Sequence, residues 1–251
     1  MFWRLIPRLT TTGKLQMAID EWLLNQHLQG NIPPTLRFYT WQPVAISLGY
    51  HQRRYPEYWQ NLTWQDKPVD IVRRPTGGRA VLHQGDLTYS LITSGISGSR
   101  IESYRAICEF LILGWRSLGI ELRYGSAGRG YIHNPNCFGT ATGADLILPN
   151  GGKLIGSAQL RKGKAILQHG SMILAPDREL FSYVFNTQPS LGIANISTSF
   201  LSDREEILSD RVIQALVTAA SECFQVKLIT EPLSEREWLE IMQEGSRKKS
   251  E

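Results

Sequence analysis

The sequence predicts an α+β fold in which a mostly antiparallel β-sheet is flanked by helices. Strand-like and helix-like segments do not alternate regularly along the chain, which disfavours a parallel, doubly wound sheet. Turn signals at 150–152 (NGG) and 162–163 (KG) separate three consecutive strand candidates, an arrangement typical of an antiparallel meander. The 251 residues suffice for one large core, so we expect a single domain over residues 1–251 without an accessory C-terminal domain.

The first half of the chain is expected to open with a helix and continue with strands. Apolar residues recur at helical spacing over 14–29, where Thr11 or Thr12 can cap the start and Gly30 can end the helix. Apolar and alternating runs then predict strands at 35–41, 44–49, 69–74, 79–83 and 86–93.

The second half is expected to contain the meander between helices. A helix is predicted over 99–118, with Gly119 after its end. The three meander strands are predicted at 144–148, 153–161 and 164–175. Further helices are predicted near 177–185, 204–220 and 234–243.

Composition excludes several functional classes. No stretch reaches the ~18–20 apolar residues of a membrane span, and the N-terminus lacks the pattern of a signal peptide. The three cysteines form no disulfide framework, which favours a cytoplasmic protein. The five histidines lack metal-ligand spacing, and neither a P-loop nor a dinucleotide fingerprint fits the glycines. The net charge of +4 suits an acidic protein partner better than nucleic acid, since the basic residues are spread along the chain.

The segment RRPTGGRAVLH (73–83) is the first candidate binding site. Consecutive glycines allow a ligand to approach the backbone closely, and the exposed N–H groups can hold an anion or a carbonyl. Three arginines could bind a phosphate or pantetheine-type group, and two apolar residues could line a channel: Arg73, Arg74, Arg79, Val81 and Leu82. A tight turn with solvated arginines accounts for the same residues equally well.

Cys137 and Lys153 are the candidate reactive pair. Cys137 lies in the loop-like stretch NPNCFGTATG, and loops carry a large share of functional groups. A nearby ammonium lowers the pKa of a thiol and so favours the nucleophilic thiolate, and Lys153 opens a strand that could fold back toward the loop. From the residues alone, Cys137 could also be a small packing residue, as most free cysteines are.

Two strands carry internal glycines, Gly156 and Gly170. Such glycines often mark the close approach of a ligand or of another backbone. Ser157 and His169 neighbour them and could face one pocket across the meander. For His169 taken alone, a hydrogen-bonded histidine beside a bulge is the simpler interpretation.

Four segments together resemble the biotin and lipoate protein ligase superfamily. They occur in the family's order and spacing, between about residue 3 and about residue 225: MAIDE (17–21), RRPTGGRAVLH (73–83), KLIGSAQ (153–159) and LQHGS (167–171). The resemblance implies a biotin/lipoate protein ligase-like catalytic domain. Within the superfamily, Cys137-Phe138 upstream of the lysine strand, and Arg79 in place of a third turn glycine, favour the octanoyltransferase branch.

The resemblance implies a reaction and its partners. Octanoate would pass from octanoyl-acyl carrier protein to the thiolate of Cys137, with Lys153 lowering the thiol pKa and later, as a neutral amine, accepting a proton. A lysine of a lipoyl domain or of the glycine-cleavage H protein would then take the acyl group, without cofactor, metal, nucleic acid or membrane. The implied substrate-binding residues are Arg74, Thr76, Gly77, Gly78, Arg79, Ala80, Val81, Leu82, His83, Gly156, Ser157, Ala158, His169 and Gly170.

Other functions remain open at this stage. An ATP-dependent lipoate–protein ligase would use Lys153 to hold a carboxylate and a phosphate, with Cys137 as a bystander. An amidotransferase would move octanoyl groups between two lipoyl proteins. A non-catalytic module would bind lipoyl domains or acyl groups without turnover.

Overall fold

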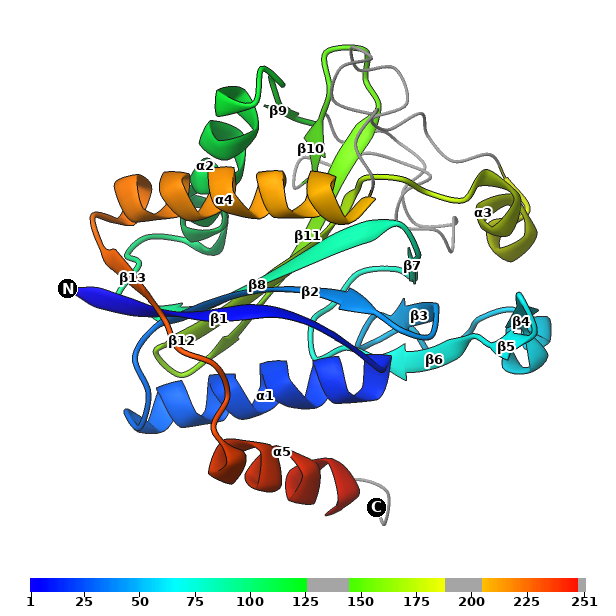
Figure 1. The fold of residues 1–251 in the computed structure, drawn as a ribbon, viewed down its shortest axis with the longest axis horizontal. Helices are drawn as coiled ribbons and strands as arrows, with labels where there is room; N and C mark the ends of the chain where they lie inside the picture. Colours follow the sequence, from blue (N-terminus) through cyan, green and yellow to red (C-terminus); the bar gives the residue numbers. More distant parts are fainter. Residues whose placement is uncertain (126–144, 188–204, 248–251) are drawn as a thin grey trace.

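An eight-stranded β-sheet forms the centre of the molecule in a computed structural model that describes residues 1–125, 145–187 and 205–247. Its strand order is β13-β1-β2-β8-β12-β11-β10-β9 (Figure 1). The strands are β1 (Phe2–Thr11), β2 (Thr35–Trp41), β8 (Asp86–Ser94), β9 (Arg123–Tyr124), β10 (Leu146–Ile147), β11 (Lys153–Lys162), β12 (Ala165–Ile173) and β13 (Lys227–Thr230). From β2 to β9 all neighbours are antiparallel, whereas β1 pairs in parallel with both β2 and β13. The predicted α+β class with a mostly antiparallel sheet is confirmed.

Helices cover both faces of this sheet (Figure 1). On one face lie α1 (Gly13–Gln29) and α5 (Glu235–Arg247), and on the other α2 (Arg100–Ser117) and α4 (Glu205–Phe224). The predicted caps of α1 are confirmed, because Thr12 accepts a hydrogen bond from the N–H of Leu15 and Gly30 adopts φ 83°. At the start of α2, Ser99 and Glu102 form a reciprocal capping box.

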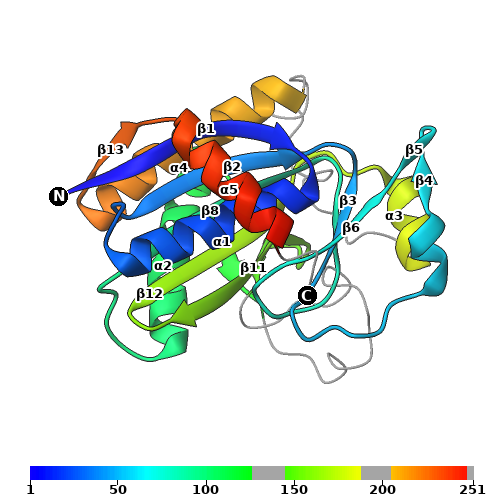
Figure 2. The same cartoon turned by 90° about the horizontal axis from the view of Figure 1, so that it is seen from below.

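A smaller sheet lies beside the end of the main sheet (Figures 1 and 2). Its order is β6-β3-β7, with β3 (Ala45–Leu48) parallel to β6 (Asp70–Arg73) and antiparallel to β7 (Val81–His83). A short hairpin of β4 (Thr63–Trp64) and β5 (Lys67–Pro68), the 3₁₀ helix η1 (Glu57–Asn61) and α3 (Arg178–Phe185) surround it. Their apolar side chains form a core cluster of their own, separate from the two clusters on the faces of the main sheet.

Most interior elements lie at their predicted ranges, whereas the strands β1, β4, β5, β9 and β13 were not predicted. No strand was expected before α1, yet β1 runs through the sheet between β2 and β13. The predicted strand at 144–148 is reduced to Leu146–Ile147 in β10. The terminal strands β1 and β13 pair with each other across almost the whole length of the chain, and local residue patterns do not reveal such a pairing.

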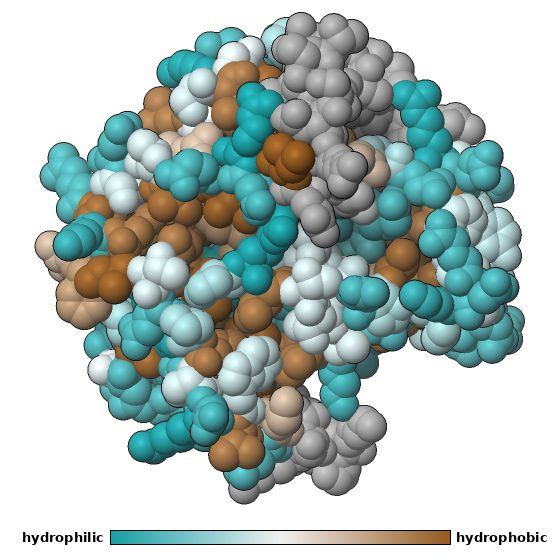
Figure 3. Space-filling model, in the orientation of Figure 1, coloured by the Kyte–Doolittle hydropathy of each residue, from teal (hydrophilic) through white to brown (hydrophobic). Residues whose placement is uncertain are grey.

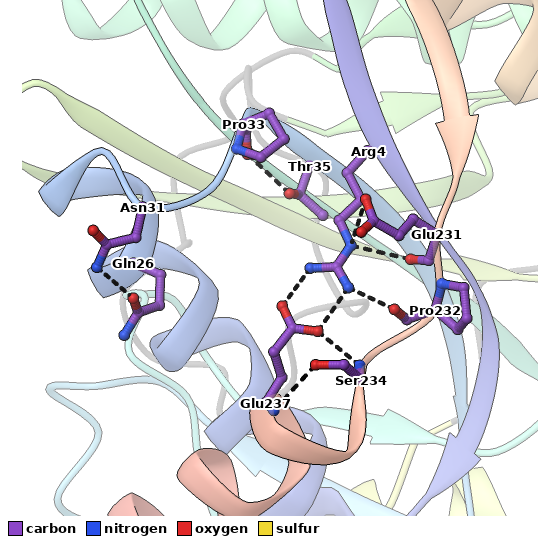
Figure 4. Close-up of polar contacts among 9 residues, drawn as sticks. All are labelled: Arg4, Gln26, Asn31, Pro33, Thr35, Glu231, Pro232, Ser234 and Glu237. Carbon is purple, nitrogen blue, oxygen red and sulfur yellow. Dashed lines mark hydrogen bonds and ion pairs between the residues drawn. The ribbon is translucent and has the colours of Figure 1, made fainter.

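The C-terminal segment is fixed to β1 by one buried arginine (Figure 4). The guanidinium of Arg4 donates to the carbonyl oxygens of Glu231 (3.0 Å) and Pro232 (2.6 Å) and to both carboxylate oxygens of Glu237 (2.6 and 2.8 Å). Ser234 and Glu237 also cap the start of α5 reciprocally. This arrangement brings α5 against α1 (Figure 2).

The face drawn in Figure 3 mixes polar and apolar side chains. The exposed apolar residues of the described ranges include Phe2 on β1, Ile207 on α4 and Ile229 on β13. Scattered exposed apolar residues of this kind are normal for a globular protein. Of the helices in the described ranges, none combines the length and the apolar character required to cross a membrane.

Candidate functional site

A cavity opens where the small sheet meets the main sheet. Its volume is ≈ 630 Å³, including the space at its mouth. Side chains from α1, β2, β3, β7, β8, β11 and β12 line it, together with the turn that precedes β7. From the residues that the resemblance implied, the structure brings to this cavity Arg74, Gly78, Val81, His83, Lys153, Gly156, Ser157, Ala158, His169 and Gly170.

The turn before β7 is shaped by a glycine contact and by an arginine. Gly78 adopts φ 98°, and its carbonyl oxygen lies so close to Gly49 that a Cβ on Gly49 would come within 1.8 Å of it. The buried guanidinium of Arg74 donates to the carbonyl oxygens of Ser47 (2.8 Å), Gly77 (2.9 Å) and Arg79 (2.7 Å). The Arg74 side chain thus holds the turn through the main-chain carbonyl groups of the turn residues, and part of the same side chain lines the cavity.

Lys153 is the buried cation of the site. Its side chain is 2% exposed, and Nζ lies 2.8 Å from Oδ1 of Asp145, which is also buried. Lys153 opens β11, and Asp145 immediately precedes β10, the neighbouring strand. The pairing of these two strands therefore creates an ion pair in the cavity wall.

The predicted meeting of the two glycine strands is confirmed by the β11–β12 register. Ser157 lies opposite Gly170, and Ala158 lies opposite His169. A Cβ on Gly170 would lie 2.4 Å from Oγ of Ser157 and 2.7 Å from the ring of Tyr89, so only glycine fits there. The hydroxyl of Tyr89 donates to Oγ of Ser157 at 2.8 Å, which fixes the serine on this wall.

His169 connects α1 to the glycine turn. Its Nδ1 lies 2.8 Å from Oδ2 of Asp20, and its Nε2 lies 2.6 Å from Oγ1 of Thr76. His169 is therefore a fully hydrogen-bonded histidine and a cavity wall residue at once. Burial raises the pKa of Asp20, but the Arg37 guanidinium and the His169 hydrogen bond outweigh it and hold that pKa below its ordinary value.

His83 belongs to a second buried polar network. Its Nδ1 lies 2.8 Å from Oδ2 of Asp86, and its Nε2 lies 2.8 Å from Oγ of Ser47. Oδ2 of Asp86 also accepts from Thr88 (3.1 Å), and the indole of Trp41 stacks on the His83 ring with 3.8 Å between centroids. Burial lowers the pKa of His83 below its ordinary value, although Asp86 opposes the shift.

The remaining predicted residues lie away from the cavity wall or outside the described ranges. Ala80 and Leu82 belong to the core of the small sheet. Thr76 is buried behind His169, while Gly77 and Arg79 contribute carbonyl oxygens to Arg74. Cys137 lies outside the described residues, so its assignment as the nucleophile stays a prediction.

Three partners of the site residues were not predicted from the sequence. Asp145 and Ser47 line the cavity and hold Lys153 and His83, and Asp20 holds His169 from outside the lining. Asp20 lies in the MAIDE segment, so family resemblance offered a signal for it. Asp145 and Ser47 carry no local signal, because their roles depend on strand pairings. Among the described residues, no group of three histidine, cysteine or acidic side chains is arranged to hold a metal ion.

Sequence comparisons identify the relatives of this chain. Residues 12–221 match the model of the lipoyl protein ligase A/B catalytic domain. The octanoyltransferase LipM of Carboxydothermus hydrogenoformans is 36% identical over 248 residues, covering 94% of this chain and 91% of the relative. The octanoyltransferase LipM of Kyrpidia tusciae is 40% identical over 188 residues, covering 70% of this chain and 68% of the relative.

Solved structures share the fold. Protein Ta0514 of T. acidophilum, with bound lipoic acid, superimposes with a TM-score of 0.79 at 21% identity, covering 98% of this chain and 96% of that one. A lipoate-protein ligase A bound with ATP gives a TM-score of 0.75 at 24% identity, covering 98% and 95%. The family match over residues 12–221 and the 36% identity to a full-length relative show that the chain belongs to the lipoyl protein ligase A/B catalytic domain family.

Proposed function

We propose that this protein is an octanoyltransferase of protein lipoylation. The observation that carries the proposal is the 36% identity to an octanoyltransferase LipM over 94% of the chain. Further relatives of the same name are up to 41% identical. The donor in this proposal is octanoyl-acyl carrier protein, and the acceptor is a lysine of a lipoyl domain or of the glycine-cleavage H protein.

The cavity suits a medium-length acyl chain that ends in a polar reaction centre. Apolar groups of Met17, Trp41 and Val81 share the wall with the ion pair of Lys153 and Asp145. Burial of about seven methylene-type groups at ~0.8 kcal/mol each would contribute roughly 5–6 kcal/mol before ordering costs. Octanoate would thus be held mainly by its chain and oriented by the polar end.

The reaction proposed here proceeds through an acyl-enzyme. The thiolate of Cys137 attacks the thioester carbonyl of the donor and the carbon–sulfur bond of the donor breaks. The carrier leaves as a thiolate, which takes up a proton from water. The ammonium of Lys153 stabilises negative charge that develops during the attack. The acceptor lysine then attacks the new thioester and forms an amide. Conversion of a thioester to an amide is favourable, so the reaction requires neither ATP nor a metal.

A transfer assay without nucleotide tests this function. Purified protein is mixed with octanoyl-acyl carrier protein and a lipoyl-domain protein, and the mass of the acceptor is followed. We expect the acceptor to gain one octanoyl group in the absence of ATP. Modification only with ATP and free lipoate would overturn the proposal in favour of a lipoate–protein ligase. Binding of the acceptor without modification under either condition would indicate a non-catalytic module.

A further inference from the structure

Octanoyl transfer to lysine requires a group that accepts a proton. The attacking amine, with an ordinary pKa of about 10.4, arrives as an ammonium and must lose a proton before and after it bonds to carbon. Lys153 forms an ion pair with Asp145, an arrangement that uses its protonated form. In its ammonium form a lysine donates hydrogen bonds and accepts none, so a separate proton acceptor is needed while Lys153 stays in this ion pair.

A hydroxyl–imidazole–carboxylate chain lies in the cavity wall. Oγ of Ser47 and Nε2 of His83 are 2.8 Å apart, and Nδ1 of His83 is 2.8 Å from Oδ2 of Asp86. Ser47 and His83 both line the cavity, whereas Asp86 lies behind them and is 6% exposed. Because a carboxylate only accepts, Nδ1 carries the imidazole proton and Nε2 is left as the acceptor for the hydroxyl of Ser47.

Each of the three groups is held in place by further hydrogen bonds. Asp86 is oriented by hydrogen bonds from Thr88 (3.1 Å) and Ser171 (2.6 Å), and Nη1 of Arg74 lies 3.2 Å from Oγ of Ser47. Ser47, His83 and Asp86 are thereby fixed in sequence, with the hydroxyl at the cavity. A base with an orienting carboxylate behind it and a hydroxyl in front of it is the arrangement by which enzymes move protons from a nucleophile.

His169, the second histidine at the cavity, has no such hydroxyl partner at the cavity wall among the described residues. Nε2 of His169 is 2.6 Å from Oγ1 of Thr76, and Thr76 is buried and does not line the cavity. His169 therefore directs its acceptor nitrogen toward the glycine turn, not toward a bound substrate. The Nε2 atom of His83, by contrast, bonds to Ser47, which lines the cavity.

We propose that Ser47, His83 and Asp86 form the proton relay of the transfer step, an inference that rests on the proposed function. The acceptor ammonium first loses one proton to solvent. As the neutral amine nitrogen then bonds to the acyl carbon and the carbon–sulfur bond breaks, the nitrogen gives a second proton to Oγ of Ser47. The hydroxyl passes its own proton to Nε2 of His83. Asp86 stabilises the resulting imidazolium, and the proton then leaves to the departing thiolate.

The electrostatic surroundings keep His83 available as a base. The charged and titratable groups that act on it are Asp86, Arg74 and His169. Burial, Arg74 and His169 lower the pKa of His83, Asp86 raises it, and the pKa remains below the ordinary 6.5. The neutral imidazole is the reactive form, so the relay is fully available above pH 6.5 and is lost as the pH drops through the lowered pKa. This loss is superimposed on the rise in rate with pH that deprotonation of the acceptor amine causes in every variant.

The pH dependence of transfer tests the relay. Single-turnover transfer of octanoate from octanoyl-acyl carrier protein to a lipoyl-domain protein is measured from about pH 4.5 to about pH 8. This range brackets the ordinary pKa of histidine. We expect His83→Gln to lose about 100-fold or more in rate. It should also lose the additional acidic fall due to His83 and keep only the pH dependence of the acceptor amine. Asp86→Asn should move the acidic fall to lower pH, because the carboxylate that raises the pKa of His83 is gone. A merely structural role would not shift this profile.

Two controls separate the possible failures. His27 is a buried histidine bonded to Ser94 and the carbonyl of Ile32, outside the cavity, so His27→Gln should keep the wild-type profile. Ser47→Ala should slow transfer at every pH, and an unchanged rate would overturn the relay. A folded His83→Gln protein that keeps the wild-type rate and profile would also overturn it. If the wild type itself transfers no octanoate, the proposed function fails instead.

Discussion

At the scale of single residues, the site depends on charges that are buried in pairs. Lys153 and Asp145 are 2% and 5% exposed at their side chains, and their opposite charges lie 2.8 Å apart. Removal of one member takes the opposite charge away from the other while that residue stays buried, which costs far more than loss of the pair as a whole. Stability and catalysis at this position can therefore be separated.

Replacement of Lys153 alone and replacement of Lys153 together with Asp145 should affect stability differently. Lys153→Met should lower the free energy of unfolding by roughly 3–5 kcal/mol, whereas Lys153→Met combined with Asp145→Leu should recover most of that loss. Both variants should lack transferase activity, because the ammonium at the reaction centre is gone in each. Urea denaturation and the transfer assay measure the two properties. An active double variant would contradict the role assigned to Lys153.

Residue patterns in the sequence indicated the glycines of the cavity more readily than the polar residues that hold Lys153 and His83 in place. The glycine pair and the strand glycines pointed to Gly78, Gly156 and Gly170, because a glycine inside a strand or turn often marks a close approach of backbone or ligand. The partners Asp145 and Ser47 lie in ordinary strand-edge sequence and acquire their roles only when β10 meets β11 and β3 meets β7. The β10–β11 pairing follows from the predicted meander, but the residue pattern does not show which side chains it brings together. The β3–β7 pairing joins segments that are further apart in the sequence and has no local signal.

At the scale of elements, α5 is held in place by the buried guanidinium of Arg4. It donates to two carbonyl oxygens and to both oxygens of Glu237, whose side chain is 16% exposed. Burial raises the pKa of Glu237, but its bonds with Arg4 and with Ser234 outweigh this effect and leave the pKa below its ordinary value. This anchor therefore stabilises the fold above the ordinary glutamate pKa and loses its contribution as the pH falls through the lowered value.

Arg4→Gln should lower the free energy of unfolding by roughly 2–3 kcal/mol at neutral pH, because four hydrogen bonds are lost and a carboxylate is left without its partner. The difference between Arg4→Gln and wild type should shrink below pH 4, roughly where glutamate protonates. The control is Arg236→Gln, since Arg236 forms an exposed ion pair with Glu240 on the same helix and should change stability by less than about 1 kcal/mol. Equal effects of the two variants would contradict the anchor.

Helices and interior strands were predictable because their signals are local. Thr12 and Gly30 delimit α1 in the sequence as they do in the structure. The N-terminal strand was not predictable in the same way, because its sequence, FWRLIPRLTT, contains two arginines and a proline that interrupt the apolar alternation. Arg4 is accommodated there by the C-terminal segment, in which Glu231 lies 227 residues further along the chain.

At the scale of the whole molecule, the fold brings two sheets together so that a cavity forms at their junction. The glycine turn belongs to the small sheet, and Lys153 and His169 belong to the main sheet. Each sheet has its own core cluster, so the site is built from two packed units. The overall class was predictable from element order, whereas the junction follows from long-range pairing.

The central claim is that octanoate passes through a thioester on Cys137 without ATP. Its most direct test is the intact mass of the purified protein after incubation with octanoyl-acyl carrier protein alone. We expect the protein to gain one octanoyl group, which hydroxylamine removes and which Cys137→Ala does not acquire. Cys108→Ala is the matched control and should still be labelled, because Cys108 is fully buried and burial raises its pKa to about 12. Labelling of Cys137→Ala to the wild-type extent would contradict the account.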